Sequence, residues 1–244
     1  MTSISRRTFL KLTLCAALTP VISKPLRALA AGPNHVEYLL RGNPRLPQVA
    51  LTIDDCFSCR LLQRAEILLA GNQIPVTFFP TGKALEGTIL QDASIWQRLA
   101  GQGHAIGYHG YTHAFASEQS LDELREDYDL WLAAAEHALG MIPEIRFARP
   151  PYGDLSYSFL DLCAEKSLVA TLWSNSWGYS SETVGPVLHQ TRSGDIILLH
   201  LRIGDLDNLE LAVPVLQAKH LQPVTLASFD EKAPLTRRAV YRME

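Results

Sequence analysis

From residue 49 onward, short hydrophobic runs alternate with longer stretches that have helical periodicity. The short runs are rich in Val, Ile, Phe and Thr, a composition typical of strands. Several are almost continuously apolar, which favours strands that are buried on both faces. The predicted strands are residues 49–54, 76–81, 104–109, 146–150, 169–175, 195–200 and 222–228.

Helical patterns occupy the stretches between these strands. Residues 59–72 carry leucines and alanines at helical spacing and stop at Gly71 and Asn72. A second helix is predicted to begin at a capping box of Ser120 and Glu123 and to end at Gly140. A third, over residues 207–220, precedes the last strand.

This alternation predicts an α/β fold in which parallel strands are joined by crossover helices. At this number of repeats we expect a distorted (β/α)7 TIM-like barrel, with an open doubly wound sheet as the alternative. A chain of 244 residues is long enough for one such barrel. Because no linker or low-complexity tract interrupts it, residues 31–244 are predicted to form a single domain.

The first thirty residues differ from the rest. Arg6 and Arg7 precede an apolar stretch from about Leu12 to Ile22, and small residues follow at 28–30. This order is typical of a secretory signal, and "SRRTFLK" resembles the twin-arginine signal that directs folded proteins to bacterial export machinery. We therefore expect a signal peptide over 1–30 and a periplasmic, cell-wall-associated or secreted protein. The apolar stretch is too short for a permanent membrane span, and an uncleaved anchor is the alternative.

The charge of the chain argues against one class of partner. The whole sequence has 22 basic and 25 acidic side chains, and residues 1–30 hold five of the basic ones and no acid. The remainder therefore has 17 basic and 25 acidic side chains, a net charge of −8. Since no basic cluster remains, we expect no nucleic-acid partner.

Polar residues stand at or just beyond the ends of the predicted strands. In a parallel barrel the carboxyl ends of all strands share one rim, where active sites are built. Residues far apart in the sequence are therefore predicted to converge there. They are Asp54, Asp55, His109, His113, Arg149, Tyr152, Asn175 and His200.

Two of these residues suggest a metal site. His109 and His113 lie four residues apart and can present their imidazoles to one ion. A carboxylate such as Asp55 would complete a set of two histidines and one aspartate that leaves positions open for water and substrate, as catalytic zinc sites require. The alternative is that both histidines are hydrogen-bonded surface residues.

Several short motifs, taken together, resemble those of the polysaccharide deacetylase family (carbohydrate esterase family 4). They occur in the family's order between residue 49 and about 226, nearly the whole chain after the signal. Gly110 stands where the family usually has Ser or Thr. The motifs are "TIDDC" (52–56), "TFFPTG" (77–82), "HGYTH" (109–113), "RPPYG" (149–153) and "LLH" (198–200).

The resemblance implies a divalent metal, zinc being the first candidate, held by Asp55, His109 and His113. It also implies that Asp54 is the general base and that Arg149 holds Asp54 through a charge-assisted bond. A metal ion in such a site polarises a carbonyl group and lowers the pKa of bound water to about 7.

The resemblance assigns the remaining roles to three residues. The backbone N–H of Tyr152 would stabilise the oxyanion, and His200 would protonate the departing amine as general acid. Leu198 would form a wall of the pocket for the acetyl methyl group. The implied reaction removes N-acetyl groups, or O-acetyl groups by the same machinery, from a cell-wall or extracellular amino-sugar polysaccharide such as peptidoglycan or a chitin-like glycan.

Two other functions are compatible with these motifs. One is a degenerate carbohydrate-binding protein that keeps the groove without turnover. The other is an amidohydrolase that acts on a small cyclic amide. Retention of the six polar residues of the motifs counts against the first.

The fourth motif of the family is altered. In "LWSNSWGY", alignment of Asn175 with the first Asp of the motif places Gly178 where the second Asp belongs, so Arg149 loses its usual carboxylate partner. Another acid then substitutes, or activity is reduced, or the substrate differs. Trp177 and Tyr179 are predicted to offer stacking surface to a sugar, with the core as the alternative environment.

Cys56 is the second departure, because Gly is usual where the backbone turns with positive φ. Three states are open for Cys56 and Cys59: a zinc-binding thiolate at Cys56, a disulfide between the two, or two reduced and partly buried thiols. A redox role is disfavoured, since Asp54 and Asp55 raise the thiol pKa.

Overall fold

The computed structural model describes residues 38–178 and 184–230. The predicted signal peptide and Tyr179 lie outside these ranges. Every pairing between the named strands is parallel. The strands are β1 (Gln48–Asp55), β2 (Thr77–Pro80), β3 (Ala105–Ile106), β4 (Phe147–Ala148), β5 (Val169–Ala170), β6 (Asn175–Ser176), β7 (Ile196–His200) and β8 (Gln222–Val224).

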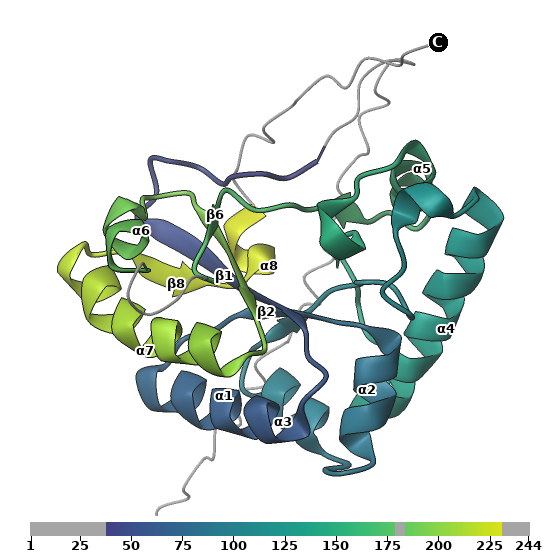
Figure 1. Ribbon diagram of the computed structural model, residues 1–244, viewed down its shortest axis with the longest axis horizontal. Helices are drawn as coiled ribbons and strands as arrows, with labels where there is room; N and C mark the ends of the chain where they lie inside the picture. The colour runs from purple at the N-terminus through teal and green to yellow at the C-terminus, as the bar shows by residue number, and fades with distance from the viewer. Residues whose placement is uncertain (1–37, 179–183, 231–244) are drawn as a thin grey trace, which may run out of the picture.

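Helices follow most of the strands and pack around their outer side, with α1 beside α7 and α2 beside α4 (Figure 1). None of the described helices is long and apolar enough to cross a membrane. The α-helices are α1 (Cys59–Asn72), α2 (Gly82–Ile89), α3 (Ile95–Gly101), α4 (Leu121–Leu139), α5 (Tyr157–Glu165), α6 (Val184–Gln190), α7 (Ile203–Ala218) and α8 (Leu226–Asp230), and the 3-10 helices are η1 (Ala116–Glu118) and η2 (Pro151–Gly153).

The strands form an irregular ring. The larger sheet has the order β3-β2-β1-β7-β6, with β8 paired to the start of β1, and β4 and β5 form a separate pair. A bridge between Tyr108 and Ala148 connects the two sheets on one side, and Leu39 and Arg41 bridge Thr171 and Asp195 on the other. The predicted distorted (β/α) barrel is therefore confirmed, and the open sheet is excluded.

Two predicted helices agree closely with the structure. Helix α1 spans 59–72 as predicted, although the left-handed residue that ends it is Gln73 rather than a glycine. Helix α4 begins with the predicted capping box at Ser120 and Glu123 and ends at Gly140, whose φ is 69°. The short helices α2, α3, α5, α6 and α8 were not predicted.

Most of the predicted strands are longer than the observed ones, and two of them show the reason. The run 169–175 divides into β5 and β6, because Thr171 N–H still bonds Ala148 of β4 whereas Ser174 N–H bonds Ile196 of β7. The run 222–228 stops at Val224, because Leu226 N–H donates to Thr77 Oγ1 and α8 begins there.

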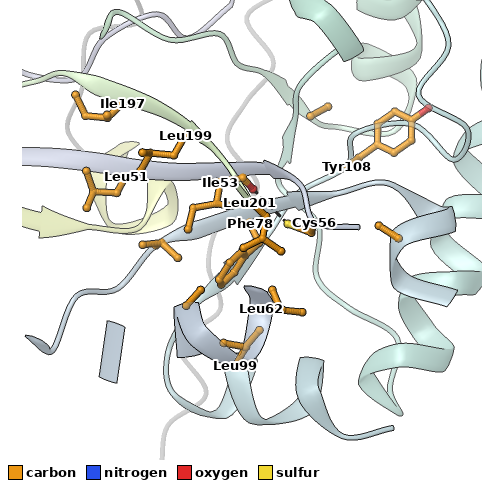
Figure 2. Close-up of a cluster of buried hydrophobic side chains, with 14 of the residues drawn as sticks. Leu51, Ile53, Cys56, Leu62, Phe78, Leu99, Tyr108, Ile197, Leu199 and Leu201 are labelled. Carbon is orange, nitrogen blue, oxygen red and sulfur yellow. Dashed lines mark hydrogen bonds between the residues drawn. The ribbon is translucent and has the colours of Figure 1, made fainter. Parts of the chain in front are cut away.

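Side chains of β1 alternate between two environments. Leu51 and Ile53 face outward and pack with Phe78 of β2 against Leu62 of α1 and Leu99 of α3 (Figure 2). Each such side chain, fully buried, contributes about 1.5–3 kcal/mol. The intervening residues of β1 face the interior of the ring. This alternation of period two places the Asp54 side chain inside the barrel at its carboxyl end.

Candidate metal centre and active site

The two aspartates at the end of β1 occupy different positions because the strand ends in an unusual turn. Asp55 and Cys56 have φ angles of 70° and 65°, a left-handed conformation that non-glycine residues seldom adopt. Cys56 N–H and Leu201 N–H both donate to the Asp54 carbonyl. Asp54 is consequently almost fully buried, whereas the Asp55 carboxylate is partly open to the rim.

Asp55, His109 and His113 meet at this rim. Asp55 Oδ1 lies 3.5 Å from His109 Nε2 and 3.1 Å from His113 Nε2, and one ligand atom from each residue lies within 4.8 Å of the others. Asp55 Oδ1 is buried, yet no donor reaches it in hydrogen-bonding geometry. One carboxylate and two imidazoles in this arrangement fit a divalent metal such as zinc. The three predicted ligands are therefore brought together.

The ionisation of Asp55 suits this interpretation. Burial alone raises the pKa of Asp55, but the imidazoles of His109 and His113 lower it by more, and the net pKa is well below its usual range. Asp55 is thus an anion facing two ring nitrogens. His109 Nδ1 donates to the carbonyl oxygen of Arg149 over 2.8 Å, which fixes the ring and leaves Nε2 directed at the centre.

Asp127 of α4 holds the segment that carries both histidines. Its buried Oδ1 accepts hydrogen bonds from Tyr108 Oη at 2.6 Å and from Tyr111 N at 2.7 Å. Between these residues Gly110 adopts a φ of 74°. Sequence reasoning missed Asp127. The available signal was an acid on the apolar face of a helix, between Leu124 and Trp131.

Arg149 lies inside the barrel and is fully buried. Its Nη1 is 2.7 Å from both Asp54 Oδ1 and Thr52 Oγ1, and its Nη2 donates to the Leu172 carbonyl at 3.0 Å. Burial lowers the pKa of Arg149, and the Asp54 carboxylate opposes that shift. Among the described acids, Asp54 is the one that pairs with Arg149, as the sequence predicted.

His200 ends β7 directly opposite Asp54 of β1. Its backbone N–H donates to Asp205 Oδ2 at 2.7 Å, and its Nδ1 lies 3.7 Å from the same oxygen. The contact with Asp205 raises the pKa of His200, burial lowers it, and the charges of Asp54 and Asp55 raise it further, so the net shift is upward. Asp205 was not predicted, although it is an acid in the first turn of α7.

Aromatic rings border the site on its open side. Tyr152, at a φ of 60°, is 58% exposed. Its ring stacks on Phe115 at 4.0 Å and meets the edge of His113 at 4.4 Å between centroids. Phe115 was missed by sequence reasoning. Leu198 lies two residues before His200 on β7 and is buried, on the same face of the strand.

The prediction that Trp177 offers a stacking surface is wrong. Trp177 is fully buried in the main core, and its Nε1 donates to Thr191 Oγ1 at 3.2 Å. No face of its ring is open to a sugar. The companion prediction for Tyr179 lies outside the described residues, and Trp173 is half-buried within 5.8 Å of the Arg149 guanidinium.

The cysteines next to the site are free thiols and are buried. Cys56 Sγ is 3.7 Å from the carbonyl oxygens of Ile53 and Asp54, and it is not among the three residues that converge as metal ligands. Burial, and then the charges of Asp54 and Asp55, raise the pKa of the Cys56 thiol. Of the three states left open by the sequence, the structure contains the reduced, buried one.

Comparison with known proteins agrees with this geometry. Residues 41–170, more than half of the chain, match the family model described as polysaccharide deacetylase. The chain belongs to the polysaccharide deacetylase family. The first four of the five motifs lie within the matched range, and the fifth, at 198–200, lies beyond it.

Individual relatives match most of the chain. A peptidoglycan-N-acetylglucosamine deacetylase of Bacillus cereus is 29% identical over 78% of this chain and 71% of its own length. A chitooligosaccharide deacetylase of Sinorhizobium fredii is 31% identical over 68% of this chain and 78% of its own. The YlxY protein of Bacillus subtilis is 26% identical over 75% of this chain, and the chain spans 57% of its length.

A solved structure of the family superposes on most of the barrel. The crystal structure of the Bc1960 peptidoglycan N-acetylglucosamine deacetylase, in complex with 4-naphthalen-1-yl-N-oxidanyl-benzamide, has a TM-score of 0.72 and 28% identity. The similarity covers 81% of this chain and 94% of that one. The distorted barrel is therefore the fold of the family.

Proposed function

We propose that the protein is a metal-dependent hydrolase that removes N-acetyl groups from an amino-sugar polysaccharide. The observation that carries this proposal is the pair of neighbouring carboxylates with different surroundings. Asp55 faces two imidazoles, and Asp54 faces a buried guanidinium. Asp55 is thereby suited to hold a cation, and Asp54 is held in place as a proton acceptor.

Asp55, His109 and His113 would hold a divalent metal, with zinc as the first candidate. Once bound, the metal would polarise the acetyl carbonyl as a Lewis acid. His109 is fixed for this task by its hydrogen bond to the Arg149 carbonyl. Because that contact uses Nδ1, the ring presents Nε2 to the centre.

Asp54 would take the proton of the attacking water. Its Oδ1 is held by Arg149, and its Oδ2 lies 3.9 Å from His109 Nε2, on the side of the metal ligands. The charge-assisted bond to Arg149 orients the carboxylate. Asp54 is therefore a base in a fixed position beside the predicted ligands.

His200 would return a proton to the departing amine. It stands across from Asp54 at the end of the neighbouring strand, so the proposed base and acid would reach the reacting carbon from adjacent strands. The Tyr152 N–H would donate to the oxyanion. Leu198 would contact the acetyl methyl group, and such a contact discriminates by about 1–3 kcal/mol per methylene.

The substrate class is proposed from the relatives and from the rim. The named relatives act on peptidoglycan and on chitooligosaccharide, both of which contain N-acetylated glucosamine. The exposed faces of Tyr152 and Phe115 offer apolar surface beside the predicted metal ligands, as a sugar ring requires. We further propose that residues 1–30 direct export by a twin-arginine pathway, so that the enzyme meets its glycan outside the cytoplasm.

The decisive experiment measures acetate and metal together. Protein stripped with a chelator is reloaded with Zn²⁺ and given peptidoglycan and N-acetylglucosamine oligomers. We expect acetate release that depends on the metal. His113→Ala should lose the metal and the activity, whereas His137→Ala, an exposed histidine of α4, should keep both. Full metal content without acetate from any of these substrates would refute the deacetylase proposal.

A second experiment tests the localisation. Replacement of Arg6 and Arg7 by Lys should leave the enzyme in the cytoplasm of the producing bacterium, because the export machinery reads the arginine pair. Fractionation followed by detection of the chain in each compartment measures this. Normal export of the double variant would contradict a twin-arginine route.

A further inference from the structure

Asp205 of α7 lies beside His200, the last residue of β7. It is buried, with 5% of its surface exposed. One carboxylate oxygen, Oδ2, accepts the His200 backbone N–H at 2.7 Å and lies 3.7 Å from His200 Nδ1. The same oxygen thus contacts both the main chain and the ring of His200.

The carboxylate of Asp205 lies next to Gly178. A Cβ atom built on Gly178 would lie 3.3 Å from Asp205 Oδ2 and 3.9 Å from Asp205 Cγ. A carboxylate carried by residue 178 would therefore reach the position that Asp205 Oδ2 now holds. The sequence lacks an acid at 178, and the structure supplies one at the same point from a different element.

Other charged groups also face His200. Asp54 and Asp55 approach it from β1, and Arg202 approaches it from the turn before α7. Asp54 is already paired with Arg149, and Asp55 with two histidines. Asp205 is the acid among them that forms a hydrogen bond with His200.

We propose that Asp205 is the positioning residue of His200 and that it supplies, from α7, a carboxylate beside position 178, where the sequence lacks one. Oδ2 lies 3.7 Å from Nδ1, and a closer approach between them would orient the ring with Nε2 available to the substrate. The Asp205 carboxylate also favours the imidazolium, which is the form that donates a proton. This inference rests on the proposed role of His200 as general acid.

The test compares two acids of the same helix. Asp205→Asn keeps an oxygen that can accept the His200 N–H but removes the charge. Asp207→Asn is the control, because Asp207 bonds Arg64 on the outer side of α7. We expect Asp205→Asn to lower kcat about 10- to 100-fold with little change in KM, as for other partners of catalytic groups. The control should behave like the wild type.

The pH profile separates positioning from a merely structural effect. His200 acts in its protonated form, and Asp205 raises its pKa. Loss of Asp205 should therefore move the alkaline limb of the kcat profile to lower pH. The double variant Gly178→Asp/Asp205→Ala should restore both the rate and the alkaline limb toward the wild-type values. An unshifted profile in Asp205→Asn, or no recovery in the double variant, would overturn the proposal.

A measurement without turnover keeps this inference distinct from the proposed function. NMR titration of the His200 ring, assigned with His200→Gln, should give a pKa above the ordinary value of about 6.5 in the wild type and a lower one in Asp205→Asn. A wild-type value below 6.5 would overturn the inference even if the variants fold poorly. If the shift is present but the wild type releases no acetate, the proposed function fails while the pairing of His200 with Asp205 is supported.

Discussion

Arg149 and Asp54 form an ion pair inside the barrel, with 2.7 Å between Nη1 and Oδ1 and almost no exposed surface on either side chain. Because both charges are removed from water, each relies on the other to offset the free-energy cost of its burial. Arg149 also packs over the ring of Phe79, at 4.4 Å from its centroid. Arg149 is therefore held by its packing on Phe79, and its charge in turn fixes the carboxylate of Asp54, the proposed base.

Asp54→Asn should abolish most of the activity without emptying the metal site. The amide can still accept a hydrogen bond from Arg149 but cannot take a proton, and loss of a general base costs about 10²–10⁴-fold in rate. Metal analysis together with acetate release measures this. Asp55→Asn is the matched control and should lose the metal instead. Wild-type turnover in Asp54→Asn would remove Asp54 from the mechanism.

Asp127→Asn should weaken both the fold and the metal site. Asp127 accepts two hydrogen bonds, from Tyr108 and Tyr111, on either side of His109. Hydrogen bonds to charged groups contribute about 1.5–3 kcal/mol each, so we expect a loss of roughly that size in the free energy of unfolding. We also expect about 10- to 100-fold weaker metal binding, as for other groups that orient ligands.

The control for Asp127 is Asp129→Asn on the same helix. Asp129 is an exposed acid that pairs with Lys166, and surface pairs contribute about 0–1 kcal/mol. Denaturant unfolding and a competitive metal titration measure the two effects. Equal behaviour of the two variants would show that Asp127 does not support the histidine segment.

The sequence predicted the barrel because its strands have a strong local signal. Val, Ile and Phe in β1 and β2 fill both sides of a parallel sheet, and the capping box of α4 is a purely local feature. The predictions are less accurate for β3, β4, β5 and β6. Each of these strands is only two residues long, so its boundaries are set by partners distant in sequence.

The part of the site that is formed by motif residues was predicted from the sequence. Asp55, His109 and His113 converge as expected because the strand ends share one rim. Asp127 and Asp205 were missed since each acts from a helix, and only the three-dimensional packing places it against a strand end. Trp177 was also misjudged. An indole ring can serve as a platform for a sugar, but residue 177 follows β6 and its ring is fully buried in the core.

His104 should make the stability of the protein dependent on pH. Burial lowers the pKa of His104 to about 4, while in the unfolded chain it is about 6.5. Between these values the unfolded state binds a proton that the folded state does not, so stability falls as the pH drops from about 6.5 to 4. The full effect is on the order of 3 kcal/mol, because one pKa unit corresponds to about 1.4 kcal/mol.

Urea unfolding at pH 7 and at pH 4.5 measures this dependence. In His104→Gln the difference between the two pH values should be smaller by the amount that His104 contributes, while Gln can still accept the Val76 N–H that now bonds His104 Nδ1. His137→Gln, at an exposed position, should keep the wild-type difference. An unchanged difference in His104→Gln would mean that this residue is not buried in its neutral form.

Cys56 provides the last prediction, since its φ of 65° is one that a side chain disfavours. Left-handed backbone costs a non-glycine residue about 1–2 kcal/mol. We therefore expect Cys56→Gly to be more stable than Cys56→Ala by about 1 kcal/mol, although both lose the buried thiol. At Cys59, the first residue of α1, the order should be reversed, because Gly is the weaker helix former. Thermal or urea unfolding of the four variants measures both differences in stability. If Cys56→Ala were more stable than Cys56→Gly, the turn after Asp55 would not be left-handed.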